Sequence, residues 1–287
     1  MAIALLGSVL FGPSDTASVG GSYTCHSGSN RKLIVWVGGE VGGGSNVNSV
    51  TYDGEPLTKY QEDDGGTHNN IAMFYLDEAD FPSTPGSYTL TATFSETMAP
   101  GFVMAAEISG ASTGDPTAYE HNYVASSDTN NDSITTTADG SWIFSCVGVG
   151  GTGTFTADSG QTILQQNSGG GGGAAYGHSY ESIATAGSES SNWTFSTSTS
   201  RFLQSCCCIE PVVALTYDQE GARWRDDDGS ETGASWLAAQ DTNINRGKNT
   251  NTRVRITTDV AGDPPSEGTT LDFRLVGDPD SEWEPVA

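Results

Sequence analysis

Four histidines are the residues best suited to acid–base or metal chemistry: His26, His68, His121 and His178. They are widely separated, and none belongs to an HxxxH or HExxH pattern, the spacings that bring two zinc ligands together. A Ser-rich chain could still form a Ser–His–Asp arrangement, but the sequence has no GxSxG elbow to expose a nucleophilic serine. The sequence therefore predicts no zinc site and assigns no residue a catalytic role.

Asp128, Asn130 and Asp132 have the alternate spacing of oxygen ligands at the start of a calcium-binding loop. Ser133 stands where that loop requires glycine, and no Glu follows at the offset that would complete it. The three residues are an incomplete calcium candidate, and a solvated acidic turn is the alternative. Five glycines at 169–173 lack the following Lys and Ser/Thr of a phosphate-binding loop. We expect no other metal site and no cofactor.

Three consecutive cysteines, Cys206, Cys207 and Cys208, lie in a run that has the composition of a strand. Strand alternation places Cys206 and Cys208 on one face and Cys207 on the other. The chain has five cysteines, an odd number without a CxxC pair, which disfavours both a disulfide framework and a zinc site. We interpret the run as small buried side chains, with a soft-metal or redox cluster as the alternative.

Carboxylates and tryptophans raise the question of carbohydrate chemistry. Glycoside cleavage needs two carboxyl groups roughly 5–9.5 Å apart, one of them in an apolar pocket. The acidic residues here lie mostly in turns, so the sequence selects no such pair. Four tryptophans could stack on sugars or fill a sandwich core: Trp193, Trp224, Trp236 and Trp283.

Composition excludes several classes of partner. The chain has 287 residues, with 11 Lys and Arg against 36 Asp and Glu, for a formal net charge of −25. Binding to nucleic acid or to an anionic membrane requires clustered basic residues, so neither is expected. Residues 1–12 are apolar but have no basic residue before them and are interrupted by Gly7 and Gly12. They predict a first β-strand rather than a signal peptide, and no run is long enough to span a bilayer.

The elements that must carry these residues are short strands. Runs rich in Val, Ile, Thr, Tyr and Phe are separated by Gly, Asn, Asp, Ser and Pro, and Asp53-Gly54 is a two-residue hairpin signal. The pattern predicts an all-β protein with strands at 32–37, 49–52, 71–76, 88–94, 102–108, 141–147, 192–195 and 201–209.

A change in composition near Glu210-Pro211 predicts two domains. Residues 1–210 hold four Lys and Arg against 21 Asp and Glu, whereas 211–287 hold seven against 15. We expect a jelly-roll-like β-sandwich over 1–210, followed by a smaller Ig-like β-sandwich over 211–287. A domain of the second size has a small core of its own, so docking on a neighbour would stabilise it.

Two passages carry a resemblance to known proteins. The first is SNRKLIVWVGG … NVNSVTYDGEPLTKY … IAMFYLDE … GSYTLTATFS, which is similar to a theme of strands and a hairpin that recurs in those proteins. The later GQTILQQNSGGGGG … WTFSTSTSRFLQ is similar to the closing part of the same theme. The match lies at residues 49–58 and 73–76, with Asp53 at one of the hairpin glycine positions. The second is YDQEGARWRDDDGSETGASWLAAQDTNI … NTRVRITTDVAGDPPSEGTTLDFRLVGD. Both passages resemble phage-like virion structural proteins, and the matching motifs specify turns and core positions rather than chemistry.

This resemblance implies a non-enzymatic virion component. We expect an outer capsid decoration, or cement, protein on the particle surface, made in the host cytoplasm without a signal peptide. Its partners would be other copies of itself and major capsid or other virion proteins, reached through the first strand and the C-terminal domain. The alternative is a tail- or fibre-associated adhesin that binds host glycans, and a virion-associated polysaccharide hydrolase is the third interpretation.

Overall fold

The computed structural model describes most of the first 213 residues and parts of the remainder. The described residues are 2–40, 46–64, 70–169, 173–199, 201–213, 216–226, 235–242, 244, 252–261, 272–273 and 284–285. His68, Trp283 and three of the five clustered glycines, at 170–172, lie outside them. The chain divides into two compact units, Met1–Val212 and Val213–Ala287, and the boundary is two residues beyond the position expected from composition.

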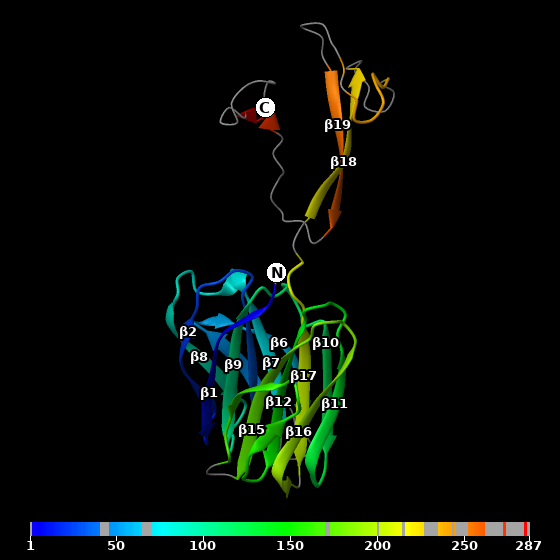
Figure 1. Cartoon of the computed structure of the whole chain (residues 1–287). Helices are drawn as coiled ribbons and strands as arrows, with labels where there is room; N and C mark the ends of the chain where they lie inside the picture. Colours follow the sequence, from blue (N-terminus) through cyan, green and yellow to red (C-terminus); the bar gives the residue numbers. More distant parts are fainter. Residues whose placement is uncertain are drawn as a thin grey trace. The chain divides into compact units, whose positions relative to one another are not determined.

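The first unit is built from antiparallel strands, as expected for an all-β protein (Figure 1). In its described part, the single helical element is the 3-10 turn Glu78–Asp80. The apolar start of the chain forms the first strand, and the Asp53-Gly54 signal is a tight turn between two paired strands. Both turn residues have positive φ, 54° and 86°, the backbone that a two-residue hairpin requires.

The first sandwich consists of two facing sheets. Its large sheet has the order β1-β9-β3-β7-β6, with β1 Ala4–Ser14, β9 Gly101–Ser109, β3 Lys32–Gly39, β7 Asn70–Asp77 and β6 Thr58–Asp64. Its small sheet has the order β2-β8-β4-β5, with β2 Ser18–Cys25, β8 Gly86–Phe94, β4 Val47–Tyr52 and β5 Glu55–Pro56.

The second sandwich repeats this arrangement. Its large sheet has the order β10-β17-β12-β15-β14, with β10 Ala118–Val124, β17 Phe202–Ile209, β12 Trp142–Gly150, β15 Ala174–Ser182 and β14 Thr162–Gln166. Its small sheet has the order β11-β16-β13, with β11 Ser127–Thr135, β16 Ser188–Thr199 and β13 Phe155–Ala157.

The strand orders of the two sandwiches correspond, with β10 taking the place of β1 and β17 the place of β9, except that β5 has no counterpart in the second sandwich. The sequence predicted one sandwich over residues 1–210, whereas the described strands form four sheets arranged as two sandwiches. The sequence reasoning missed the division because short strands at regular spacing look the same whether they belong to one sandwich or to two.

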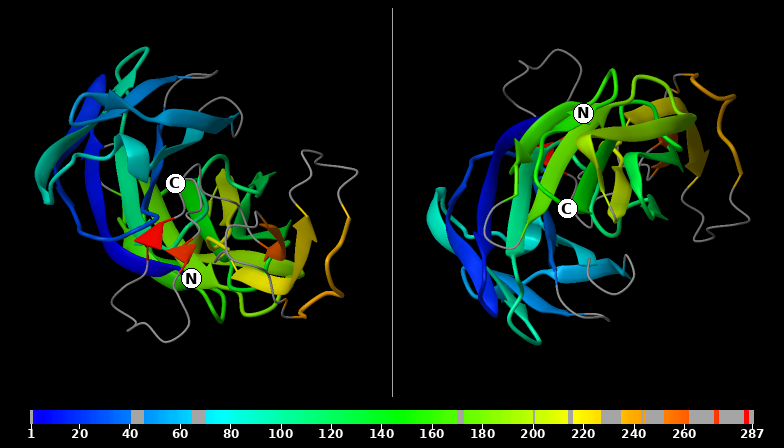
Figure 2. Two further views of the ribbon diagram at one scale, coloured as in Figure 1. Left: turned by 90° about the horizontal axis from the view of Figure 1, so that it is seen from above. Right: turned by 90° about the horizontal axis from the view of Figure 1, so that it is seen from below.

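The two sandwiches pack through their large sheets, as the views along the strands show (Figure 2). Apolar side chains of both large sheets form one core between the sandwiches, in which the rings of Phe102 and Tyr176 lie 3.9 Å apart. Separate cores lie inside each sandwich. The large-sheet strands β3, β9 and β17 are therefore buried on both faces, which explains why their sequences are mainly apolar instead of alternating.

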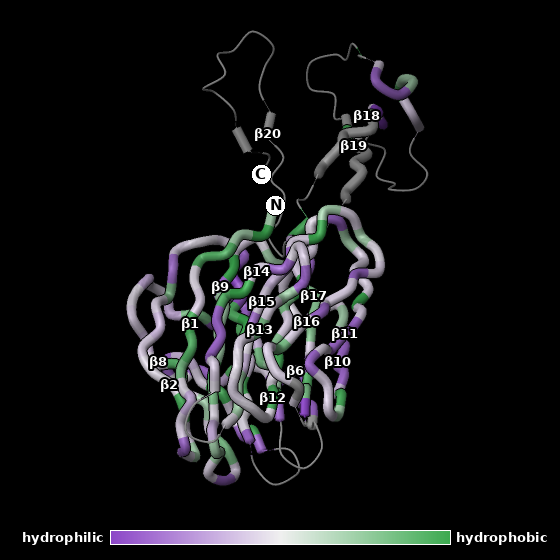
Figure 3. The backbone as a smooth tube through the Cα atoms, turned by 60° about the horizontal axis from the view of Figure 1, so that its bottom comes forward, coloured by the Kyte–Doolittle hydropathy of each residue, from purple (hydrophilic) through white to green (hydrophobic). Residues whose placement is uncertain are grey.

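The cysteine run illustrates this two-sided burial. Cys207 lies in the core between the sandwiches, while Cys206 and Cys208 lie in a core inside the second sandwich, as strand alternation predicted. All five cysteines are buried and unpaired. By contrast β10 and β11 are mostly polar, and they appear largely purple in the hydropathy view (Figure 3).

The described part of the second unit is centred on a hairpin. Strands β18 (Thr216–Asp226) and β19 (Thr252–Ala261) pair antiparallel, with a bulge between Gln219 and Gly221. The segment 235–241 runs along the other edge of β18, where Trp236 forms a bridge with Arg225. Two short strands, β20 (Asp272–Phe273) and β21 (Glu284–Pro285), also pair.

Candidate functional site

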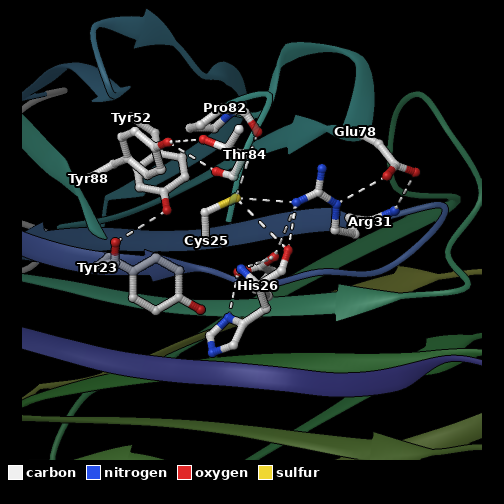
Figure 4. A network of polar contacts seen from close by, with 10 residues as sticks. Tyr23, Cys25, His26, Arg31, Tyr52, Glu78, Pro82, Thr84 and Tyr88 are labelled. Atoms are coloured by element: carbon white, nitrogen blue, oxygen red, sulfur yellow. Dashed lines mark hydrogen bonds and ion pairs between the residues drawn. The ribbon is translucent and has the colours of Figure 1, made fainter. Parts of the chain in front are cut away.

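A polar network in the first unit surrounds Glu107, on β9. Figure 4 shows its members Cys25, His26, Arg31 and Glu78. The Glu107 side chain is fully buried, and both of its oxygens accept the backbone N–H of His26 at 3.2 Å. The His26 Nδ1 lies 2.9 Å from Glu107 Oε2, and Arg31 Nη1 lies 3.9 Å from Oε1. A buried carboxylate requires such partners, because an unpaired charge in an apolar core is strongly unfavourable.

Arg31 connects this carboxylate to the edge of the sandwich. Its Nε donates to Glu78 Oε1 at 3.1 Å, and its Nη1 donates to the His26 carbonyl at 2.7 Å and to Cys25 Sγ at 3.2 Å. The guanidinium also lies 4.6 Å from the centre of the Phe81 ring. One arginine thereby fixes the β2–β3 loop against the 3-10 turn and against β9.

A bulge in the first strand makes room for this network. The pairing of β1 with β9 shifts register between Leu5 and Gly7, and Gly7 stands opposite Glu107. A Cβ atom at Gly7 would lie 2.5 Å from Cε1 of His26. The glycine is therefore needed because the imidazole occupies the space that a side chain would fill.

Three side chains near Glu107, those of Tyr23, Tyr52 and Cys25, are held in their neutral forms. Burial, reinforced by the charge of Glu107, raises the pKa of Tyr23 far above its ordinary value. Burial likewise raises the pKa of Tyr52 and of the Cys25 thiol. A nucleophilic cysteine needs a lowered pKa and access to solvent, and Cys25 has neither. The Glu107 network, which we call the ionic clasp, therefore joins His26 and Arg31 to β9 inside the first sandwich.

A second carboxylate, Asp63 on β6, joins the two sandwiches. It accepts hydrogen bonds from the Tyr119 hydroxyl and from Ser205 Oγ, the latter at 2.7 Å. His121 Nδ1 lies 3.3 Å from its other oxygen. Ser205 is buried and donates to the carboxylate rather than to the imidazole, so these residues do not form the Ser–His–Asp relay that a hydrolase needs.

Lys32, at the start of β3, anchors the segment between the sandwiches. It is almost fully buried, and its Nζ donates to Asp77 Oδ1 at 2.5 Å and to the Gly114 carbonyl at 2.7 Å. Asp77 in turn accepts the Gly114 N–H at 2.8 Å, and Lys32 lies over the Tyr75 ring. Burial lowers the Lys32 pKa, and the ion pair with Asp77 opposes that effect.

His178, on β15, has a different environment. It is fully buried, stands opposite Cys146, and has the Phe144 ring 5.9 Å away. Neither ring nitrogen has a hydrogen-bond partner among the described residues. Burial lowers the His178 pKa to about 3, so the imidazole is neutral at neutral pH. A group without access to solvent or a partner has no means of exchanging a proton with a substrate.

The calcium candidates lie in strand β11 rather than in a loop. Asn130 is buried, and its Nδ2 donates to the carbonyls of Asn122 and Phe202. Asp132 Oδ1 accepts the Ser133 N–H, and Asp128 is exposed. Within the described ranges, no three His, Cys, Asp or Glu side chains are grouped to hold a metal ion.

The tryptophans separate into core and surface positions. Trp193 is buried, with its Nε1 donating to Ser145 Oγ at 3.0 Å, which leaves no face for a sugar. Trp224 is half-buried, whereas Trp236 is 39% exposed. Trp236 is therefore the exposed one of the four within the described residues, and the guanidiniums of Arg223 and Arg225 lie 4.3 and 4.8 Å from the centre of its ring.

Sequence reasoning missed the residues that organise these networks: Glu107, Asp63, Lys32 and Arg31. One signal was available, because Glu107 stands alone in the apolar run GFVMAAEIS, and Lys32 begins the run KLIVWV. A single charge in a strand buried on both faces requires a partner. The partner could not be identified, because Glu107 is 81 positions from His26 and Asp63 is 142 from Ser205.

Comparison with protein families, with curated proteins and with solved structures gives no match to this chain. The described residues contain no helix with the length and hydrophobicity needed to cross a membrane.

Proposed function

We propose that this protein is a virion structural protein, an outer capsid decoration or cement protein that stabilises the particle. In this proposal it is made in the host cytoplasm and resides on the particle surface, in contact with other copies and with major capsid proteins. The polar networks of the first unit fit this role, because they join strands and sandwiches to one another.

The observation that carries the proposal is the strand order of each sandwich. In an eight-stranded jelly roll, one sheet holds the first, eighth, third and sixth strands, and the other holds the second, seventh, fourth and fifth. The orders β1-β9-β3-β7 and β2-β8-β4-β5 follow this rule, with β6 as an addition. The orders β10-β17-β12-β15 and β11-β16-β13 follow it as well, with β14 as an addition and no strand in the fifth position. We therefore assign a jelly roll to each sandwich, a fold that is frequent in viral capsids.

The second unit fits a smaller accessory domain. For it we propose the Ig-like sandwich expected from the sequence, with the β18–β19 hairpin and the bridged segment at 235–241 as part of one sheet. The high negative charge supports the overall proposal, because it keeps free subunits soluble and apart until a matched surface is available.

The test is binding to capsid shells that lack the protein. Purified full-length chain is added to such shells, and the shells are then imaged by electron cryomicroscopy and heated while their integrity is followed. We expect saturable, symmetric density on the capsid surface and a higher disruption temperature. Density restricted to the tail, or no binding to shells, would contradict a decoration role.

A tail- or fibre-associated adhesin is the second candidate, and the exposure of Trp236 favours it. An exposed indole is a suitable platform for a sugar ring, and jelly rolls are also frequent in lectins. A glycan array probed with the wild-type chain and with Trp236→Ala checks this candidate. Binding that disappears in the variant would favour the adhesin, with Trp193→Phe as a control at a buried tryptophan.

A further inference from the structure

The two lysines within the described residues have different surroundings. The side chain of Lys59 is 34% exposed and pairs with Glu62, three residues along the same strand. The side chain of Lys32 is 1% exposed and pairs with Asp77. Burying an ammonium group is costly, and a lysine in such a site gives up its proton more easily and can then act as a nucleophile. Lys32 is therefore the lysine with the surroundings of a reactive amine.

Asp77 presents its carboxyl group directly to this amine. The two residues stand opposite each other in the β3–β7 ladder, and Lys32 Nζ lies 2.5 Å from Asp77 Oδ1. Because Cγ is bonded to that oxygen, it lies on the order of 3–3.5 Å from Nζ, the separation of reacting atoms that are positioned for attack. The side chain of Asp77 is 19% exposed, so the pair is largely withdrawn from water.

The backbone of Gly114 holds both groups in place. Its carbonyl accepts a hydrogen bond from Lys32 Nζ at 2.7 Å, and its N–H donates to Asp77 Oδ2 at 2.8 Å. The φ of Gly114 is 86°, a backbone conformation that glycine adopts without strain. When a carboxyl carbon is attacked, negative charge develops on the oxygen that stays, and an N–H already directed at that oxygen stabilises the charge.

Tyr75 forms one wall of the site. The centre of its ring lies 4.5 Å from Lys32 Nζ, and its hydroxyl donates to Asp115 Oδ1 at 2.6 Å, which holds the ring in place. Burial lowers the pKa of Lys32, although the hydrogen bond and the charge of Asp77 oppose this effect. The neutral amine is therefore easier to reach here than it would be at the surface.

We propose that Lys32 and Asp77 condense to form an isopeptide bond, which joins β3 to β7 covalently. Two protons pass from the ammonium group to Asp77 Oδ1, one before the attack and one from the tetrahedral intermediate. The electron pair of Nζ forms the bond to Cγ, and the bond between Cγ and Oδ1 breaks. One water molecule leaves with both protons, and the amide keeps Oδ2 as its carbonyl oxygen. The step needs no oxidant, reductant or further reactant.

An amide suits this site better than a permanent ion pair does. Condensation replaces two buried charges by a neutral group, which removes the cost of keeping those charges away from water. The amide has one N–H and one carbonyl oxygen, and Gly114 already provides the acceptor and the donor for them. A covalent link between strands would serve a durable particle component, but the inference rests on the site itself and not on placement on a virion.

The experiment is intact-mass spectrometry of the purified full-length chain in denaturant, followed by tandem mass spectrometry of its proteolytic peptides. Once any removal of Met1 is accounted for, we expect the wild type to be lighter than its sequence by one water molecule. We also expect a branched peptide in which residue 32 is joined to residue 77. A wild type with the full sequence mass and no such peptide would overturn the proposal, whether or not any variant folds.

Lys32→Arg is the closest variant, because a guanidinium can keep the ion pair with Asp77 but does not lose its proton to become a nucleophile. This variant and Asp77→Ala should both have the full sequence mass. Lys59→Arg is the matched control at the exposed lysine, and it should keep the loss of water. A loss of water that persists in Lys32→Arg would indicate a succinimide at another aspartate, such as Asp53 before Gly54, and would refute the isopeptide bond.

Discussion

The two sandwiches of the first unit share a strand order, but they differ in the residues at equivalent positions of their interiors. Positions of the two sandwiches are equivalent when they stand opposite equivalent residues of the neighbouring strand. Glu107 on β9 stands opposite Leu33 on β3, and Cys208 on β17 stands opposite Ile143 on β12, so Glu107 and Cys208 are equivalent. The first sandwich thus has an ionic clasp where the second has a small thiol in an apolar core. One backbone arrangement tolerates either solution, provided that the charged one is fully paired.

A second pair of equivalent positions shows the same difference between a charged and an uncharged residue. Lys32 begins β3 with an ion pair to Asp77, and the equivalent Trp142 begins β12 with its ring stacked on Tyr180 at 4.4 Å. The first sandwich fixes the start of this strand by an ion pair, and the second fixes it by the stacking of two aromatic rings. Three of the substitutions below convert residues of one sandwich into their equivalents in the other, and therefore test whether the two interiors are interchangeable.

The largest effect is expected for Glu107→Cys, which gives the first sandwich the residue of the second. The backbone N–H of His26 would lose its buried acceptor and Arg31 its buried ion-pair partner, at a cost of about 3–5 kcal/mol in the free energy of unfolding. Urea denaturation of the two proteins measures the difference. A loss under 1 kcal/mol would mean that the clasp contributes little and that the interiors are interchangeable.

The next effect is a loss of stability at acidic pH, caused by His178. The His178 pKa lies below its ordinary value of 6.5, at about 3, so the unfolded chain binds a proton that the folded one does not. The His178 contribution to stability is thus complete above pH 6.5 and declines as the pH falls toward 3. The slope is about 1.4 kcal/mol per pH unit, reaching on the order of 4 kcal/mol by pH 3.

His178→Met places at this position the residue that the first sandwich has at its equivalent, Met73. In the ladders, Met73 stands opposite Trp36 and His178 stands opposite Cys146. The variant should show a shallower decline of unfolding free energy between pH 6.5 and 4 than the wild type. Parallel curves for the two proteins would indicate that the imidazole takes up a proton without unfolding.

A smaller effect is expected for Gly7→Ala. Gly7 stands opposite Glu107, and the equivalent residue opposite Cys208 is Ala118. The added methyl would displace the His26 ring from Glu107, for a loss of about 1–3 kcal/mol. In a His26→Ala background the same substitution should have almost no effect, which a double-mutant cycle measures. Equal losses in both backgrounds would mean that the methyl group lowers stability through contacts other than the one with His26.

The smallest effect is expected for Cys208→Ala, the counterpart of the first substitution. Removing one sulfur from an apolar core leaves no charge unpaired and should lower stability by about 0.5–1.5 kcal/mol. Thermal unfolding compared with Glu107→Cys establishes the ranking. A larger loss for Cys208→Ala than for Glu107→Cys would reverse the comparison between the sandwiches.

The local sequence pattern alone determined the all-β fold class and many of the strands. Strand composition and turn residues act over a few positions, so the all-β fold, the Asp53-Gly54 hairpin and the faces of the three consecutive cysteines followed from the sequence. The calcium candidates also rested on local spacing. Spacing in a loop, however, does not carry over to a strand, and Asn130 instead bonds to backbone carbonyls.

Tertiary structure decided which strands pair, and therefore where charge is allowed in the interior. The doubling of the sandwich, the packing of the two large sheets and the partners of Glu107 and Asp63 join residues separated by many tens of positions. A buried charge is stable only beside its partner, and the sequence does not specify a partner at such a distance. The strand pairing brings these residues together, and the chemistry of the interior depends on it.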